Sequence, residues 1–288
     1  MRQQRLPSET GGGCMSWRKF LLVPRLAGAG LRPAPAPEQA WESYWRAVQR
    51  TGPEGDVLWD GAGRQELQWW SATSRQYLDP TLPVLDVGCG NGRLSRLLAE
   101  DFPAVLGIDV SAAAVERAAH ESEGRPRLAF RQLDITTDTT GETLAAELGP
   151  ANAVIRGVLH VFDCERRRRA ARNLARVLAP HGTLILLETH WPGDNLEYLE
   201  ALGGRHGRLP SPLARLIDER LPRPSRFGPR ELAQTFPATT WTTVTTGPVG
   251  ITLIPTLGPD ALKTIPGFGA VLRVAHTVPK GMADRADP

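Results

Sequence analysis

One short segment, residues 82–93, carries the residue types and spacing of a ligand-binding turn. A short apolar run leads to an acid, Asp86, and glycines then alternate at Gly88, Gly90 and Gly92. Glycine has no Cβ, so the backbone can approach a ligand closely. A dinucleotide-binding turn has the spacing G-x-G-x-x-G, whereas this one is G-x-G-x-G, and a carboxylate before it would repel a phosphate. The pattern therefore favours a ligand with an ammonium group, such as an amino-acid moiety.

Two more acids stand where predicted strands end. Residues 105–108 form an apolar strand that ends at Asp109, and Ser111 is placed to cap the helix that follows. The alternating segment 127–133 leads to Asp134. An acid that ends the second strand, about 20 residues after the first glycine, is positioned to accept hydrogen bonds from both hydroxyls of a ribose. A ribose is therefore predicted as part of the ligand.

This order of glycine turn and acids resembles the class I S-adenosylmethionine-dependent methyltransferases. The turn is similar to their motif I, and the segment LAPHGTLILLE at 178–188 is similar to their motif VI region, departing from it only at His181. The resemblance covers about residues 60–280 and implies S-adenosyl-L-methionine as the cofactor. It implies cofactor contacts at Asp86, Gly88, Cys89, Gly90, Asn91, Gly92, Asp109, Val110, Asp134, Ile135 and Arg156. Asp134 would accept from the adenine amine, and Ile135 would pack on the ring.

The resemblance also implies an α/β fold, a Rossmann-like seven-stranded, mostly parallel sheet with a terminal antiparallel strand and helices on both faces. An N-terminal helical layer and a lid insertion after strand 5 complete the expected architecture. The sequence places the last two strands at 241–246 and 268–274. The predicted organisation is a disordered tail at 1–36, a helical cap at 37–80 and a methyltransferase core at 81–288, with the lid at 192–227.

The predicted cap is rich in aromatic residues. Trp41, Tyr44, Trp45 and Val48 recur at helical spacing and predict an amphipathic helix. These aromatics either attach the helical layer to the core or, in addition, roof the pocket. The tract from Tyr44-Trp45 to Trp59-Asp60 is similar to a segment of thiopurine-methyltransferase-type enzymes that folds over the cofactor. This similarity implies a cofactor contact for Trp59.

Candidate catalytic residues follow strands 4 and 5, where open α/β sheets place the substrate. His160, Glu188 and His190 stand there. A sulfonium methyl donor needs little activation, so the enzyme has to align the acceptor for in-line displacement, exclude water and, where needed, remove a proton. His160 is interpreted either as a base or as a structural or cofactor-facing residue. Methyl transfer by proximity alone, without a base, is the alternative mechanism.

The acceptor is expected to be a small molecule, a natural product or a xenobiotic, bound beside the cap and the lid. Trp69, Trp70 and Trp191 are the candidate substrate contacts. The chain lacks an N/D-P-P-Y segment after strand 4, which argues against amino-directed DNA or protein-glutamine methylation. The four arginines at 166–169 are interpreted as solvated surface, because successive helix residues point about 100° apart and cannot form one stripe.

Composition and charge indicate a soluble globular protein. The net charge of +3 is too small to imply a nucleic-acid partner, and the excess of arginine over lysine is interpreted as a coding bias. Cys14, Cys89 and Cys164 lie too far apart to suggest a disulfide framework or a zinc site, so no metal is expected. There is no apolar run near 18 residues, so no membrane span is predicted. We expect a cytoplasmic monomer or homodimer, with organelle targeting through the basic tail as the minor alternative.

Three other functions are compatible with parts of the pattern. A nucleotide-dependent oxidoreductase is opposed by the glycine spacing and by Asp86. A repurposed or non-catalytic protein would bind S-adenosylmethionine without turnover. A methyltransferase of RNA or protein would need a basic surface, which the scattered arginines do not provide.

Overall fold

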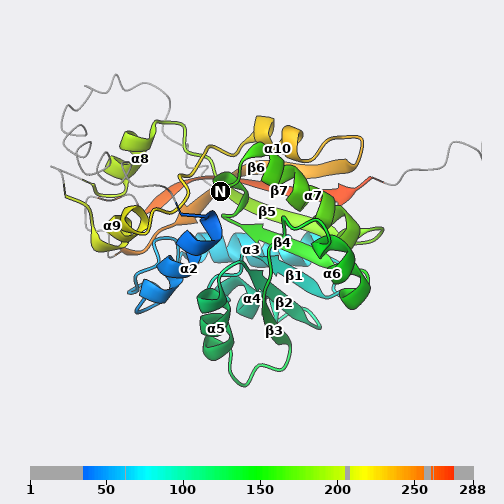
Figure 1. Cartoon of the computed structure of the whole chain (residues 1–288). Helices are drawn as coiled ribbons and strands as arrows, with labels where there is room; N and C mark the ends of the chain where they lie inside the picture. Colours follow the sequence, from blue (N-terminus) through cyan, green and yellow to red (C-terminus); the bar gives the residue numbers. More distant parts are fainter. Residues whose placement is uncertain (1–34, 62, 205–207, 256–260, 262, 276–288) are drawn as a thin grey trace, which may run out of the picture.

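A seven-stranded sheet forms the centre of the molecule (Figure 1). The computed structural model describes residues 35–61, 63–204, 208–255, 261 and 263–275. The strands lie in the order β3-β2-β1-β4-β5-β7-β6. Their bounds are β1 (Val84–Val87), β2 (Val105–Asp109), β3 (Leu128–Gln132), β4 (Asn152–Arg156), β5 (Thr183–Thr189), β6 (Trp241–Thr252) and β7 (Thr264–Val274).

Strand direction confirms the predicted fold class. Strands β1 to β5 pair in parallel, whereas β7 runs antiparallel to both of its neighbours, β5 and β6. The last two strands are longer than the predicted 241–246 and 268–274, because their ladder continues as far as the pair Thr252 and Thr264. Pro248 lies within β6, which is an edge strand and therefore tolerates a residue without an N–H donor.

Alternate residues of the central strands fill two apolar layers, one on each face of the sheet. Leu184 and Leu186 of β5 pack with helices α6 (Thr140–Leu148), α7 (Cys164–Leu178) and α10 (Pro229–Thr235). Ile185 and Leu187 pack with α3 (Arg64–Tyr77) and α4 (Arg93–Leu98) on the other face. The predicted helices on both faces are therefore confirmed, and β1, β2 and β5 are buried along their whole length.

The N-terminal aromatic residues build a third apolar cluster. Tyr44 and Trp45 of α2 (Pro37–Ala47) are buried together with Val48, Val57 and Ala114, the last of which belongs to α5 (Ala112–Glu121). Helix α2 therefore packs on α5, next to the carboxyl end of β2. The predicted tail falls almost entirely outside the described residues. The division of the chain into a cap and a core stays a prediction.

The insertion after β5 carries two short helices, α8 (Asn195–Ala201) and α9 (Ser211–Asp218). Leu202 and Leu213 are buried in the same apolar cluster as α3, which anchors both helices to the sheet. Arg215 of α9 reaches the segment after α2, with its Nη1 atom 3.3 Å from Asp56 Oδ2. The insertion therefore adjoins the N-terminal layer, as Figure 1 shows for α9 and α2.

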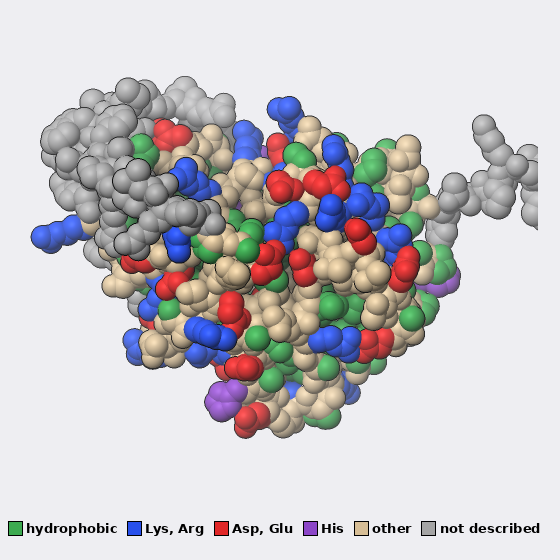
Figure 2. All heavy atoms as spheres, in the orientation of Figure 1, with side chains coloured by type: hydrophobic (Ala, Val, Ile, Leu, Met, Phe, Trp, Pro, Cys, Tyr) green, Lys and Arg blue, Asp and Glu red, His purple; other side chains and the backbone are tan. Residues whose placement is uncertain are grey.

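Charged side chains of both signs are interspersed on the face of the molecule seen in Figure 2. Elsewhere among the described residues, charged side chains pair with one another, as Arg75 does with Asp101 at 2.8 Å and Arg169 with Glu165 at 3.2 Å. The face seen in Figure 2 therefore presents no continuous basic surface.

Among the described residues, no helix has the length and apolar character that crossing a membrane requires.

One buried amide ties the loop after β3 to helix α7. Asn173 of α7 is 1% exposed, and its Nδ2 atom donates to the carbonyl oxygens of Ile135 at 2.7 Å and Thr137 at 2.8 Å. Helix α6 approaches it closely, because a Cβ on Gly141 would lie 2.6 Å from Asn173 Cα. The position of Ile135, and of Asp134 beside it, thus depends on a side chain on a distant helix.

We expect Asn173→Ala to lower the free energy of unfolding by about 2 kcal/mol, because it leaves two backbone carbonyls without their donor. Urea denaturation followed by circular dichroism measures the change. Arg172→Ala is the matched control, since that neighbour is exposed on the same helix and should shift stability by less than about 0.5 kcal/mol. Equal effects of the two substitutions would contradict this role of Asn173.

Candidate functional site

The glycine turn between β1 and α4 has a backbone conformation that requires glycine. Gly88, Gly90 and Gly92 have φ values of 72°, 54° and 73°, a region in which other residues are strained. Asp109 at the end of β2 holds the turn in place. Its Oδ2 atom accepts from the Gly90 amide at 3.0 Å, and its Oδ1 atom accepts from the Ser111 amide at 3.0 Å.

Two adjoining pockets open at this turn, and we call them the first and the second lobe. The first lobe has an open volume of about 800 Å³ and lies at the carboxyl ends of β1 to β4. The second has an open volume of about 640 Å³ and lies between the turn, α3 and residues 57–61. The residues that line both lobes are Trp45, Trp59, Gly88, Gly90 and Arg156.

The residues that the sequence predicted for cofactor binding are distributed over the two lobes. Those that line only the first lobe are Asp109, Val110, Asp134 and Ile135. Those that line only the second are Asp86, Cys89 and Asn91. Gly92 lines neither lobe. It is the N-cap residue of α4, and a Cβ there would lie 2.8 Å from the ring of Phe130.

Burial changes the ionisation of two acids at the turn. Asp86 is 2% exposed and Asp109 is 9% exposed, and burial raises the pKa of each carboxyl to about 6. The charge of Asp109 raises the pKa of Asp86 further, whereas the Ser95 hydroxyl, which donates at 2.5 Å, lowers it. Both carboxylates are therefore costly to keep ionised without a partner, and a ligand that donates hydrogen bonds or carries positive charge would stabilise them.

At the far end of the first lobe, Asp134 has one oxygen occupied and one directed to a cation. Its Oδ1 atom accepts from the amide and the hydroxyl of Thr136, both at 2.8 Å. Its Oδ2 atom lies 3.5 Å from Arg166 Nη2, which also pairs with Glu38 at 2.7 Å. The Arg166 guanidinium lies over the Phe162 ring, 4.9 Å from the centroid, and lines the lobe. Arg166 is a site residue that the sequence did not predict.

The interpretation of residues 166–169 as solvated surface is wrong for half of the run. Arg166 lines the first lobe, and Arg167 is buried, where it donates to the Leu159 carbonyl at 2.7 Å and to the Ser225 hydroxyl at 2.6 Å. Arg168 and Arg169 are exposed. The helix turns by about 100° per residue, so the four arginines are spread over several faces of α7. The sequence of the run does not show which of these faces is buried.

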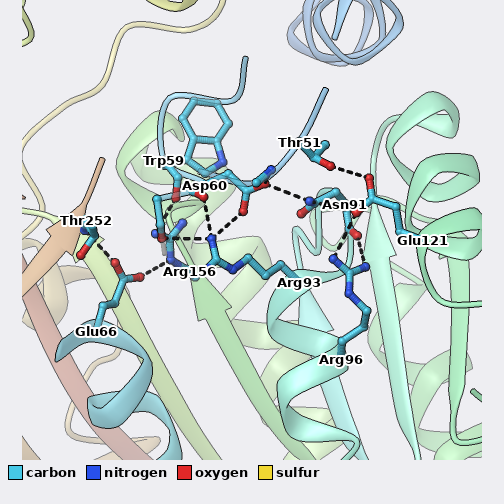
Figure 3. Close-up of polar contacts among 12 residues, drawn as sticks. Thr51, Trp59, Asp60, Glu66, Asn91, Arg93, Arg96, Glu121, Arg156 and Thr252 are labelled. Carbon is cyan, nitrogen blue, oxygen red and sulfur yellow. Dashed lines mark hydrogen bonds and ion pairs between the residues drawn. The ribbon is translucent and has the colours of Figure 1, made fainter. Parts of the chain in front are cut away.

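A charged network holds residues 51–61 and Glu66 over the glycine turn (Figure 3). Asp60 is 4% exposed and lies at its centre. It accepts from the Gly52 amide at 2.5 Å, from Asn91 Nδ2 at 3.0 Å and from Arg93 Nη1 at 3.0 Å. Arg93 also donates to the Asp60 carbonyl at 2.6 Å. The segment after α2 is thereby fixed to Asn91 in the turn and to Arg93 at the start of α4.

The other half of the network centres on Arg156, at the end of β4 (Figure 3). Its Nε atom donates to Glu66 Oε1 at 2.5 Å, and its Nη2 atom donates to the Trp59 carbonyl at 2.9 Å. The second oxygen of Glu66 accepts from the Thr252 amide at 2.7 Å. Glu66 therefore joins α3, β4 and β6. The sequence did not predict Glu66, whereas Arg93 follows the glycine turn directly, a position that could have indicated it.

The three predicted substrate tryptophans lie in different places. Trp70 is 1% exposed and lines the second lobe, and its indole N–H has no acceptor among the described residues. Trp69 covers β7, where a Cβ on Gly269 would lie 2.7 Å from its ring. Trp191 packs on Tyr198 of α8, with ring centroids 5.5 Å apart. Trp69 and Trp191 line neither lobe, and the substrate roles of all three stay predictions.

The structure brings two of the predicted catalytic residues into contact. Glu188 at the end of β5 is fully buried and accepts from the amides of Val158, Leu159 and His160 at 2.8 to 3.1 Å. His160 lies in a short helix, η2 (Leu159–Val161), with its Nδ1 atom 2.7 Å from Glu188 Oε2. A carboxylate that accepts from three amides makes His160 Nδ1 the protonated nitrogen, which leaves Nε2 as the basic one.

His160 lies close to the wall of the first lobe. A Cβ on Gly157, which lines that lobe, would be 3.7 Å from His160 Cε1. The ring is 13% exposed and no described residue hydrogen bonds to its Nε2 atom. Ser225, in the insertion, bonds to the His160 carbonyl through its amide at 2.8 Å and its hydroxyl at 2.6 Å. Backbone and ring of His160 are therefore both held in place.

His190, the third predicted catalytic residue, has both ring nitrogens occupied. Its Nδ1 atom lies 3.0 Å from the Phe227 carbonyl, and its Nε2 atom lies 3.0 Å from Arg226 Nη2. A carbonyl only accepts and a guanidinium only donates, so in this geometry Nδ1 donates to Phe227 and Nε2 accepts from Arg226. Both nitrogens of His190 are thus engaged within the protein, and its role as a base stays a prediction.

Comparisons with known proteins converge on one kind of domain. A family model described as a methyltransferase domain matches residues 84–182. The chain is 24% identical over 174 residues to N-demethylindolmycin N-methyltransferase of Streptomyces griseus, which covers 60% of this chain and 71% of that protein. It is 28% identical over 159 residues to the eEF1A lysine and N-terminal methyltransferase of Danio rerio, covering 54% of this chain and 22% of that protein.

A solved structure extends the likeness to most of the chain. The SAM-dependent methyltransferase from Anabaena variabilis has a TM-score of 0.73 and 27% sequence identity to this chain. The superposed region covers 85% of this chain and 97% of that one. The likeness therefore includes the sheet and much of what surrounds it, beyond the segment that the family model matches.

Proposed function

We propose that this chain, which is a class I S-adenosylmethionine-dependent methyltransferase, transfers a methyl group to a small-molecule acceptor. The observation that supports a small-molecule acceptor is the layer of N-terminal residues that covers the site, which we call the roof. Trp41, Trp45 and Trp59 of the N-terminal layer line the lobes from above, and the network of Asp60 and Arg156 holds that roof down. The Streptomyces griseus relative, whose name gives a small molecule as its acceptor, supports the same class.

The two lobes fit S-adenosyl-L-methionine, the cofactor of this enzyme class. Asp109 in the first lobe is a buried acceptor suited to ribose hydroxyls, and Asp134 Oδ2 is suited to the adenine amine. Asp86 in the second lobe suits the ammonium group of the amino-acid end. Gly90, with its positive φ, leaves the backbone between them without a side chain. The bound cofactor supplies an electrophilic methyl group on a positively charged sulfur.

His160 is the residue that we infer to act as the base, with Glu188 as its positioning residue. The Nδ1–H group of His160 donates to the fixed Glu188 carboxylate. The Nε2 atom therefore keeps its lone pair and can take a proton from the molecule that is methylated. The anionic partner stabilises the imidazolium that results. The roof excludes water, and the remaining requirement is alignment of the acceptor for in-line displacement. Transfer by proximity alone is the alternative for acceptors that need no deprotonation.

Two features argue against a polymer substrate. The face seen in Figure 2 mixes charges of both signs, and arginines such as Arg131 and Arg166 are paired with carboxylates. Nucleic-acid binding needs unpaired cations along the phosphate backbone. The relative that is named for a protein substrate shares only 22% of its own length with this chain.

We expect Asp109→Ala to weaken binding of S-adenosylhomocysteine at least tenfold, about 1.4 kcal/mol, through lost hydrogen bonds to a charged group. Isothermal titration calorimetry measures the affinity. Asp138→Ala changes an exposed acid in the next loop and should leave affinity unchanged. Because Asp109 also holds the turn, Asp109→Asn provides the variant of matched shape. Unchanged affinity in both Asp109 variants would remove this residue from the ribose contact.

The acceptor class is tested by formation of S-adenosylhomocysteine with small amines, phenols and thiols, compared with tRNA and protein extracts as acceptors. We expect turnover with a small molecule, with a rate that changes by less than about twofold between 50 and 300 mM salt, because no phosphate backbone is bound. Turnover with RNA or protein alone would overturn the proposal. Tight cofactor binding with no product from any acceptor would instead support a repurposed binding protein.

With an acceptor that must lose a proton, His160→Gln should lower kcat about 100-fold, the usual contribution of a general base. The affinity for S-adenosylhomocysteine should stay within about twofold, since the ring lies beside the first lobe and does not line it. His190→Gln is the control and should leave kcat nearly unchanged. A loss of less than tenfold in His160→Gln would show that proximity alone drives the transfer.

A further inference from the structure

The junction of the two lobes is where the sulfur of the cofactor has to lie. S-Adenosyl-L-methionine joins its nucleoside to its amino acid through that sulfur atom. With the ribose at Asp109 in the first lobe and the ammonium group at Asp86 in the second, the sulfur falls between them. The residues that line both lobes there are Trp45, Trp59, Gly88, Gly90 and Arg156.

This junction contains no carboxylate to balance the charge of a sulfonium. Asp60, Glu66 and Asp86 line the second lobe only, and Asp109 lines the first lobe only. Arg156 is the cation among the shared residues, and its ion pair with Glu66 at 2.5 Å balances its charge within the protein. The groups left to meet a positive charge are the two indoles.

Trp59 has one ring face stacked on Tyr44, whereas Trp45 approaches the glycine turn with its six-membered ring. One face of Trp59 stacks on Tyr44, with centroids 5.7 Å apart and planes at 26°, while the ring still lines both lobes. Trp45 points its six-membered ring at the turn, because a Cβ on Gly90 would lie 2.9 Å from Cζ2 and 3.2 Å from Cη2. The negative potential of an aromatic ring lies on its face and the positive potential on its edge. Trp59 is therefore the indole that suits a cation.

The backbone around Trp59 is fixed before any ligand binds. Arg156 donates to the Trp59 carbonyl at 2.9 Å, and the next residue, Asp60, is held by Arg93 and Asn91 at 3.0 Å each (Figure 3). Tyr44, which supports the ring, is fully buried. A side chain held in this way loses little conformational entropy when a ligand arrives.

We propose that Trp59 recognises the sulfonium of the cofactor by a cation–π contact and so distinguishes the charged methyl donor from its uncharged demethylated product. Such a contact is stronger over tryptophan than over tyrosine or phenylalanine, and it strengthens when water is excluded. The product keeps the nucleoside and the amino acid but has lost the charge. This inference depends on the placement of the cofactor and not on the identity of the acceptor.

The test compares the affinities of S-adenosylmethionine and S-adenosylhomocysteine in each variant by calorimetry, without any acceptor. In Trp59→Leu, the ratio of the product Kd to the donor Kd should fall about tenfold relative to the unmodified protein, mostly through weaker donor binding. Trp59→Phe keeps a smaller ring and should give an intermediate ratio. If the leucine variant does not fold, the phenylalanine variant carries the test by itself.

Trp41→Leu is the matched control, because Trp41 lines only the first lobe and packs on Trp59 in a T-shaped pair with ring centroids 5.9 Å apart. It should weaken both ligands by the same factor and leave the ratio unchanged. An unchanged ratio in the Trp59 variants, with both ligands weakened equally, would overturn the proposal. Trp59 would then contribute only apolar contact to the site. A fall of the ratio in Trp41→Leu as large as in Trp59→Leu would also overturn it.

Discussion

Buried carboxylates that accept from backbone amides are the interaction on which this site depends. Asp109 binds the amides of Gly90 and Ser111, and Glu188 binds three amides at the start of η2. Asp60 does the same with the Gly52 amide. In each case the loop at the end of a strand or helix is closed around an acid, since a buried carboxylate without such donors would be strongly destabilising. The loops that shape both lobes therefore follow from where these acids stand.

The acids at the glycine turn and the arginines around it differ in whether they have a charged partner within the protein. Asp86 and Asp109 have raised pKa values, near 6, because they are buried without a neighbouring cation in direct contact. Arg156 and Arg93, by contrast, are engaged by Glu66 and Asp60. The acids at the turn are thus left to the ligand, whereas the arginines are used to hold the roof. Arg166, the third arginine that lines the lobes, is likewise paired with Glu38. This division explains how a site lined by three arginines can still accept a positively charged cofactor.

The sequence was sufficient for the fold and for one side of the site. Glycine spacing and the acids after two strands identify Asp109 and Asp134 because such residues follow the chain order of the strands, and parallel strands bring their ends together. Contacts set by tertiary packing were not predictable in this way. Glu66 meets Arg156 across 90 residues, Arg226 occupies His190 across 36, and the arginine run gave no sign that Arg167 is interior. The fold could therefore be predicted from the order of motifs along the chain, whereas the partners of these side chains become known only from the packed structure.

The roof that encloses the lobes is held by several moderate contacts and not by one strong one. Hydrogen bonds to charged groups contribute about 1.5 to 3 kcal/mol each, and partly buried ion pairs contribute less once desolvation is included. Asp60, Glu66 and Glu42 each connect the N-terminal layer to a different element of the core, namely α4, β4 and the start of α5. Contacts of this size can break one at a time. The apolar cluster of Tyr44, Trp45, Val48 and Val57 against Ala114 adds to these contacts, and Trp59 packs on that cluster. Polar contacts and apolar packing together therefore hold Trp59 where it lines both lobes.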